Sequence, residues 1–260
     1  MGYVCDAEPL KVAIIDCSPR DQEMMSYGGA KWTISELVSR RVQAFAHWRN
    51  VTIKPRLYWP AGRKHDYPDI EKYDTIIIPG SKLHIDVGGI QKHPWMENLL
   101  EFIRDVPSST SMLGICFGHQ AIAAAHGAFV RKIPKPHNAE IGFAPVYKTE
   151  YGKYDVLFKD LPNDFEGLFS HFCYLPHPPR GTRVLAYGDI PGMVQAYRIG
   201  ESTWGVQFHP DYLPHNISEL VNERKRWLSK MMDISRIKIK AQQRHDEKVL
   251  INFIDHAASV

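Results

Sequence analysis

The chain has 260 residues, of which 44% are hydrophobic and 23% are charged, and its formal net charge is +3 at pH 7. This length favours one domain with a large core, and the nearly balanced charge, without a basic stripe, argues against nucleic-acid binding. No apolar segment is long enough to span a membrane, and none is typical of a signal peptide. We therefore expect a cytoplasmic protein without a cofactor. The cysteines lack the spacing of a disulfide framework or zinc site: Cys5, Cys17, Cys116 and Cys173.

The first half of the chain alternates strand-like and helix-like segments, which predicts a parallel sheet with helices on both faces. Short β-branched runs indicate buried strands, and apolar residues at helical spacing indicate amphipathic helices. Pro55 cannot donate to a strand ladder, so its strand is expected at a sheet edge, and Gly127 is a favourable helix end. The expected elements are strand 11–16, helix 33–48, strands 51–59 and 73–81, helix 95–106, strand 111–116 and helix 117–127.

The second half changes character, because turn clusters separate a series of short strand candidates. This pattern predicts antiparallel strands added to the parallel sheet. From residue 215 the chain becomes helical and strongly charged, and its last stretch, 234–256, is either a solvated surface helix or a partner-binding helix. We expect a tail over 1–10, one domain over 11–215 and a charged helical extension over 216–260. The strand candidates are 127–133, 142–149, 165–171, 182–188, 193–200 and 203–209.

A cysteine stands between two glycines where a predicted strand meets a predicted helix. The run Gly114-Ile115-Cys116-Phe117-Gly118 has the form of a nucleophile elbow with cysteine in place of serine. At a helix N-terminus the unpaired N–H groups and the helix dipole stabilise a thiolate and can hold an oxyanion. The alternative from this motif alone is a buried core thiol.

A cysteine nucleophile needs a base, and the segment "TWGVQFHPDY" offers one. His209 ends an apolar run, and Asp211 follows two residues later, on the same side of an extended chain. The carboxylate can then accept a hydrogen bond from the imidazole and fix its tautomer. The alternative is a strand-end histidine whose neighbouring aspartate caps the next turn.

Together, "GICFGHQ" and "GVQFHPD" resemble the class I glutamine amidotransferase family. The resemblance extends over residues 11–212 and includes the segments "TIIIPGS", "AEIGFAPV" and "SHFCYLP" in the family order. It is most similar to a free-standing branch that includes γ-glutamyl peptidases and GMP-synthase-like amidotransferase domains. The implied fold is α/β and flavodoxin-like, with a mostly parallel central sheet, helices on both faces, added antiparallel strands and a C-terminal helical extension.

The resemblance also implies a role for each matching residue. The catalytic residues would be the nucleophile Cys116, the general base His209 and its orienting partner Asp211. The backbone N–H groups of Gly80 and Phe117 would form the oxyanion hole. The substrate-binding residues would be Gln120, Ser170, His171, Phe172 and Cys173.

The sequence departs from the family pattern at three places. One is the segment "PGSKLHID", which differs from the Gly-Gly-Pro version of the oxyanion strand and points away from biosynthetic synthetase domains. Asp211 stands where the family has glutamate, so its hydrogen bond to His209 is expected either to be longer or to need a local shift of the chain. Cys173 stands where the family has aspartate, so a carboxylate that could meet the ammonium group of the substrate is missing. His171 and Cys173 suggest no metal site, because further ligands at zinc spacing are absent.

Three functions follow as expectations. The first is self-sufficient hydrolysis of a γ-glutamyl amide, either glutamine or a γ-glutamyl peptide, through a thioester on Cys116. The second is a glutaminase that delivers ammonia to a separate synthetase partner, with the charged C-terminal helices as docking element. The third is a catalytically inactive binding or regulatory protein, suggested by Cys173. The presence of the nucleophile and base favours the first.

Overall fold

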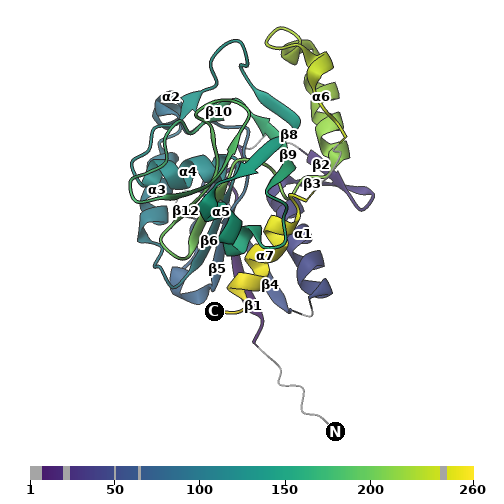
Figure 1. The fold of residues 1–260 in the computed structure, drawn as a ribbon. Helices are drawn as coiled ribbons and strands as arrows, with labels where there is room; N and C mark the ends of the chain where they lie inside the picture. The colour runs from purple at the N-terminus through teal and green to yellow at the C-terminus, as the bar shows by residue number, and fades with distance from the viewer. Residues whose placement is uncertain (1–7, 20–23, 50, 64–65, 241–244) are drawn as a thin grey trace.

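The computed structural model describes residues 8–19, 24–49, 51–63, 66–240 and 245–260. Its centre is a nine-stranded sheet, in which five parallel strands are followed by four strands that add in antiparallel fashion (Figure 1). This confirms the predicted α/β class. The strand order is β4 (Ile53–Tyr58), β1 (Leu10–Ile15), β5 (Thr75–Ile78), β6 (Ser111–Ile115), β13 (Thr203–Val206), β12 (Val194–Ile199), β11 (Arg183–Gly188), β8 (Glu140–Lys148) and β9 (Asp164–His171).

One strand lies where the sequence predicted it, and two differ from the prediction in pairing or length. β4, which contains Pro55, lies at the sheet edge as predicted. β13 was expected among the antiparallel additions, but it pairs parallel with β6 and antiparallel with β12, so it joins the two halves of the sheet. The strand expected over 127–133 shrinks to β7 (Arg131–Lys132), which pairs with β10 (Cys173–Tyr174) outside the main sheet.

Helices cover both faces of the sheet (Figure 1). On one face, α1 (Ile34–Trp48) and α7 (Lys248–Ala257) contribute to one apolar core, and on the other face α3 (Trp95–Asp105) and α4 (Phe117–Ala125) contribute to a second. Phe253 of α7 is 1% exposed, so this C-terminal helix belongs to the core of the molecule instead of lying as a solvated helix on its surface. The remaining helical elements are η1 (Ile70–Lys72), α2 (Val87–Lys92), α5 (Glu150–Tyr154), η2 (Val156–Phe158) and η3 (Ile234–Arg236).

A hairpin that the sequence analysis did not predict precedes α1. It consists of β2 (Met24–Tyr27) and β3 (Ala30–Thr33), joined by Gly28 and Gly29 at φ values of 60° and 80°. Glycine adopts such positive φ values without steric cost, which suits a tight two-residue hairpin turn. The hairpin packs with α6 (Pro214–Leu228) in a third apolar cluster.

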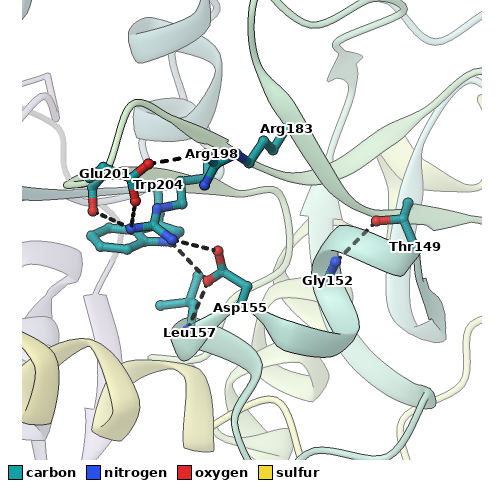
Figure 2. A network of polar contacts seen from close by, with 8 residues as sticks. All are labelled: Thr149, Gly152, Asp155, Leu157, Arg183, Arg198, Glu201 and Trp204. Atoms are coloured by element: carbon teal, nitrogen blue, oxygen red, sulfur yellow. Dashed lines mark hydrogen bonds and ion pairs between the residues drawn. The ribbon is translucent and has the colours of Figure 1, made fainter.

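The end of β13 opposite the carboxyl edge is held by a buried polar network (Figure 2). Asp155 accepts hydrogen bonds from the Leu157 N–H at 2.9 Å, from Trp204 Nε1 at 3.0 Å and from Arg198 Nη1 at 3.3 Å. The Arg198 guanidinium also lies over the Trp204 ring at 4.8 Å. One carboxylate thus connects the η2 turn with β12 and β13, which fixes the start of the strand that leads to His209.

No helix within the described residues combines the length and the apolar character that a membrane crossing requires.

Candidate active site

The predicted catalytic residues follow neighbouring strands of the parallel sheet. Gly80 comes after β5, Cys116 directly after β6, and His209 shortly after β13. These strands are adjacent in the order β5-β6-β13, and their carboxyl ends meet at one sheet edge. In open α/β sheets this edge is where ligands bind. The topology therefore brings together residues that lie far apart in the chain.

Cys116 occupies a strained turn between β6 and α4. Its φ of 51° and ψ of −99° are rare for a residue with a side chain, and its N–H donates to the Val206 carbonyl at 2.9 Å. A Cβ on Gly118 would lie 1.9 Å from the Ile78 oxygen, and one on Gly114 would lie 2.4 Å from Gly118 carbonyl atoms. Only glycines allow this close approach of strand, turn and helix.

The Cys116 side chain stands at the N-terminus of α4. The first helical hydrogen bond runs from Gln120 N to the Cys116 carbonyl at 3.2 Å, which leaves the N–H of Phe117 without a partner inside the helix. Such N–H groups and the helix dipole favour negative charge on a nearby sulfur or oxygen.

His209 is buried and contacts both Asp211 and Cys116. Its Nδ1 lies 3.2 Å from Asp211 Oδ1, and the Tyr212 ring stacks on it with centroids 3.8 Å apart. Burial alone lowers the pKa of His209, but the charges of Asp211 and Cys116 and hydrogen bonds with both raise this pKa to about 10. The Asp211 distance exceeds the 2.7–2.9 Å that is usual for a charge-assisted bond, in line with the expected effect of the shorter side chain.

Gly80 lies against the side chains of both His209 and Cys116. A Cβ added to it would come within 2.7 Å of His209 Cε1 and 3.7 Å of Cys116 Cβ. The next residue orders this loop, because Ser81 Oγ donates to the Cys17 carbonyl at 2.9 Å and accepts from Leu83 N at 3.1 Å. The backbone after β5 is thus fixed beside the thiol.

The predicted substrate-binding segment comes from the far edge of the sheet. It reaches the site because β9 meets the chain after β13: His209 N donates to the Leu168 carbonyl at 2.7 Å. The Ser170 carbonyl lies 3.9 Å from the Cys116 sulfur. The antiparallel half therefore folds back over the carboxyl edge of the parallel half.

Gln120 and His171 make polar contacts within the protein. Gln120 Nε2 donates to the Cys173 carbonyl at 2.8 Å and to Gln207 Oε1 at 2.9 Å. His171 Nδ1 lies 2.8 Å from the same carbonyl, and its Nε2 lies 2.8 Å from Glu140 Oε2. Both ring nitrogens of His171 thus have an acceptor atom within hydrogen-bonding distance. These two side chains therefore fix the Cys173 backbone at the pocket wall.

A pocket of about 490 Å³ opens above the thiol. Of the ten predicted site residues, eight line it, while Gly80 and Asp211 lie outside its lining. The sequence analysis missed several lining residues: Ile34, residues 81–84, Tyr212, and Glu223, Arg224 and Trp227 of α6. The α6 residues could not be found from local patterns, because they reach the pocket through tertiary packing.

No cluster of three or more histidine, cysteine, aspartate or glutamate side chains suited to a metal ion occurs within the ranges that the structure describes. Burial raises the pKa of Cys173 to about 12, with a further contribution from Asp86, so this thiol stays protonated. Cys173 is therefore a neutral group in the pocket wall.

Curated relatives match parts of the chain. One is the glutamine-hydrolyzing component of the GMP synthase of Methanococcus vannielii, which is 34% identical over 115 residues, covering 44% of this chain and 57% of the relative. Gamma-glutamyl peptidase 4 of Arabidopsis thaliana is 28% identical over 145 residues, which cover 55% of this chain and 56% of the relative. The chain thus spans little more than half the length of these relatives.

Solved structures share the fold, and the sequence matches a family model. A glutamine amidotransferase from Thermotoga maritima has a TM-score of 0.67 at 17% identity and covers 98% of this chain and 100% of its own. One from Methylobacillus flagellatus has a TM-score of 0.63 at 17% identity and covers 96% and 92%. The family model described as glutamine amidotransferase class-I matches residues 33–224. This chain therefore belongs to the class I glutamine amidotransferase family.

Proposed function

We propose that this protein hydrolyses a γ-glutamyl amide, with Cys116 as nucleophile. The observation that carries the proposal is the arrangement of three groups at one sheet edge. Cys116 is held in a strained turn at a helix N-terminus, and His209, with its pKa raised to about 10, contacts both Cys116 and the buried Asp211. This arrangement suits a thiolate–imidazolium pair, the reactive form of a cysteine hydrolase.

The chemistry proceeds in two steps. The Cys116 sulfur attacks the side-chain carbonyl carbon of the substrate, and the N–H groups of Gly80 and Phe117 stabilise the oxyanion. His209 gives its proton to the departing nitrogen, so that ammonia or an amine leaves and a γ-glutamyl thioester remains. His209 then takes a proton from water, which attacks the thioester, releases glutamate and restores the Cys116 thiolate beside the His209 imidazolium. Asp211 holds the His209 ring in the required tautomer throughout.

The pocket supports a substrate larger than glutamine. Its volume of about 490 Å³ lies within the range of roughly 300–1,000 Å³ that is typical of pockets for drug-sized ligands. The similarity to a gamma-glutamyl peptidase points in the same direction. The finer proposal is therefore a γ-glutamyl peptide or a related conjugate as substrate, with Gln120 and the segment from Ser170 to Cys173 around its amino-acid end.

The experiment measures free glutamate after incubation of the purified protein with glutamine and, separately, with γ-glutamyl peptides. We expect turnover of the peptides that disappears in Cys116→Ala. A glutamine-mimicking diazoketone should label Cys116 in the unaltered protein. Failure of the electrophile to label Cys116, together with no glutamate from any substrate, would refute the proposal.

A second candidate function is that of a glutaminase that serves a separate synthetase. The similarity to the glutamine-hydrolyzing component of a GMP synthase is the observation that favours it. The same assay distinguishes the two functions. Turnover of glutamine that begins only after a synthetase partner is added would support this second function against the first.

A further inference from the structure

The outer wall of the active-site pocket is formed by α6, in the last fifth of the chain. Glu223, Arg224 and Trp227 line the pocket from this helix. The helix is held against the β2–β3 hairpin, because Glu219 Oε1 accepts from Ser26 Oγ at 2.6 Å and its other oxygen lies 3.2 Å from Lys31 Nζ. Figure 1 shows α6 beside this hairpin, at the end of the molecule where β8 and β9 also lie. The wall is therefore anchored in the fold.

Glu223 is the acidic side chain among the described residues that line the pocket. It is exposed, and within the described part of the chain it forms no hydrogen bond or ion pair. Other pocket-lining side chains are cationic or can become so, among them Lys82, Arg224 and the buried His209. A substrate ammonium group that enters this pocket therefore finds a carboxylate at Glu223 among the described lining residues.

Nearby carboxylates already have partners elsewhere. Glu140 Oε2 lies 2.8 Å from both His171 Nε2 and Gln195 Nε2, and Asp86 Oδ1 accepts from Gly89 N at 2.8 Å. Neither Glu140 nor Asp86 lines the pocket. Cys173, which does line it, is a buried neutral thiol and cannot act as an anion.

We propose that Glu223 of α6 binds the α-ammonium group of the γ-glutamyl substrate, which makes this helix a specificity determinant of the active site. This inference rests on the proposed function, because it requires a substrate with a free amino group beside its amide. A carboxylate–ammonium contact is present in both the bound substrate and the transition state, so its loss raises KM more than it lowers kcat.

The test compares two substrates that differ only in the amino group, γ-glutamylalanine and its deamino analogue glutarylalanine. In the unaltered protein, kcat/KM should be about tenfold higher for γ-glutamylalanine than for glutarylalanine. This ratio lies between the effects expected from losing an exposed ion pair and from losing a hydrogen bond to a charged group. Glu223→Gln should reduce this preference to within about twofold. The control Glu71→Gln removes the same charge from the exposed η1 turn and should keep the preference.

An unchanged preference in Glu223→Gln would overturn the inference while leaving the hydrolase function intact. If the protein releases no glutamate from any γ-glutamyl compound, the proposed function fails. The role of Glu223 is then tested separately, by measuring the affinity of the protein for the two compounds. Calorimetric titration of γ-glutamylalanine and glutarylalanine into Cys116→Ala and into Cys116→Ala with Glu223→Gln supplies that readout. Equal affinity of the two compounds for Cys116→Ala, or binding of neither, would overturn the role of Glu223.

Discussion

Replacing Asp211 by asparagine tests how the proposed base is tuned. The carboxylate lies 3.2 Å from His209 Nδ1 and is fully buried, so water does not screen it. The His209 pKa of about 10 exceeds its ordinary value of 6.5 despite burial, a difference on the order of 4–5 kcal/mol. Asp211 is the largest of the contributions that raise this pKa. A hydrogen bond between charged groups is worth up to roughly 3 kcal/mol, so loss of the Asp211 charge should lower kcat/KM by about 10²-fold.

The sign of the pH dependence follows from the same contacts. In the unaltered protein His209 keeps its proton until the pH approaches about 10, so activity that needs the imidazolium should fall only in that range. Without the Asp211 charge, only Cys116 still raises the pKa of His209 against the effect of burial, so the alkaline limb should move toward acid. Asp211→Asn should therefore lose its imidazolium at a lower pH than the unaltered protein.

The assay is the pH profile of kcat/KM for glutamate release, with a thermal melt to verify folding. Asp105→Asn, which removes an exposed carboxylate at the end of α3, serves as the matched control and should keep the profile. A loss below about tenfold with an unmoved alkaline limb would refute the reasoning. It would mean that a group other than Asp211 orients and charges His209.

Two further substitutions test the site and the core. Gly80→Ala would place a Cβ within 2.7 Å of His209 Cε1, so kcat/KM should fall by about 10²-fold or more. The control Gly88→Ala, whose Cβ would lie 3.8 Å from the nearest atom, should keep its kcat/KM. Equal kcat/KM values for the two variants would contradict the close approach of Gly80 to His209. Phe253 is 1% exposed, so Phe253→Ala should lower the free energy of unfolding, measured with denaturant, by about 3–5 kcal/mol. Phe129 is 71% exposed, so the control Phe129→Ala should lower it by less than about 0.5 kcal/mol. Similar losses for the two would argue against α7 as a core helix.

The sequence predicted the parallel half of the fold because its signals are local. Buried strands of β-branched residues and amphipathic helices follow each other, and single residues such as Pro55 and Gly127 mark an edge and a helix end. The β2–β3 hairpin was missed although Gly28 and Gly29 signal a tight turn between short strands. The parallel pairing of β13 was missed for a different reason, because a strand's direction relative to a distant neighbour leaves no trace in its own residues.

In the candidate site, too, local sequence patterns reveal some residues and not others. Cys116 and His209 carry motifs that identify them as a candidate pair, and the sheet order brings their strands together. Glu223 and Trp227 lie in a charged helix that is like many solvated helices in sequence. Their place at the pocket depends on how α6 packs against a hairpin some two hundred residues earlier in the chain, and no local pattern records that contact.

The residues of the proposed chemistry and those of the proposed substrate recognition come from different parts of the fold. The thiol, the imidazole and the oxyanion donors stand at the ends of parallel strands, where strand spacing and helix geometry fix them to within small tolerances. The pocket wall that meets the rest of the substrate comes from the folded-back segment after β9 and from α6, whose residues can change without moving that edge. Because Cys173 is neutral, it cannot bind the substrate amine as a carboxylate would. In the proposed recognition, that carboxylate comes from the pocket wall formed by α6. This helix is held to the hairpin at Glu219, and Glu223 lies one helical turn further on.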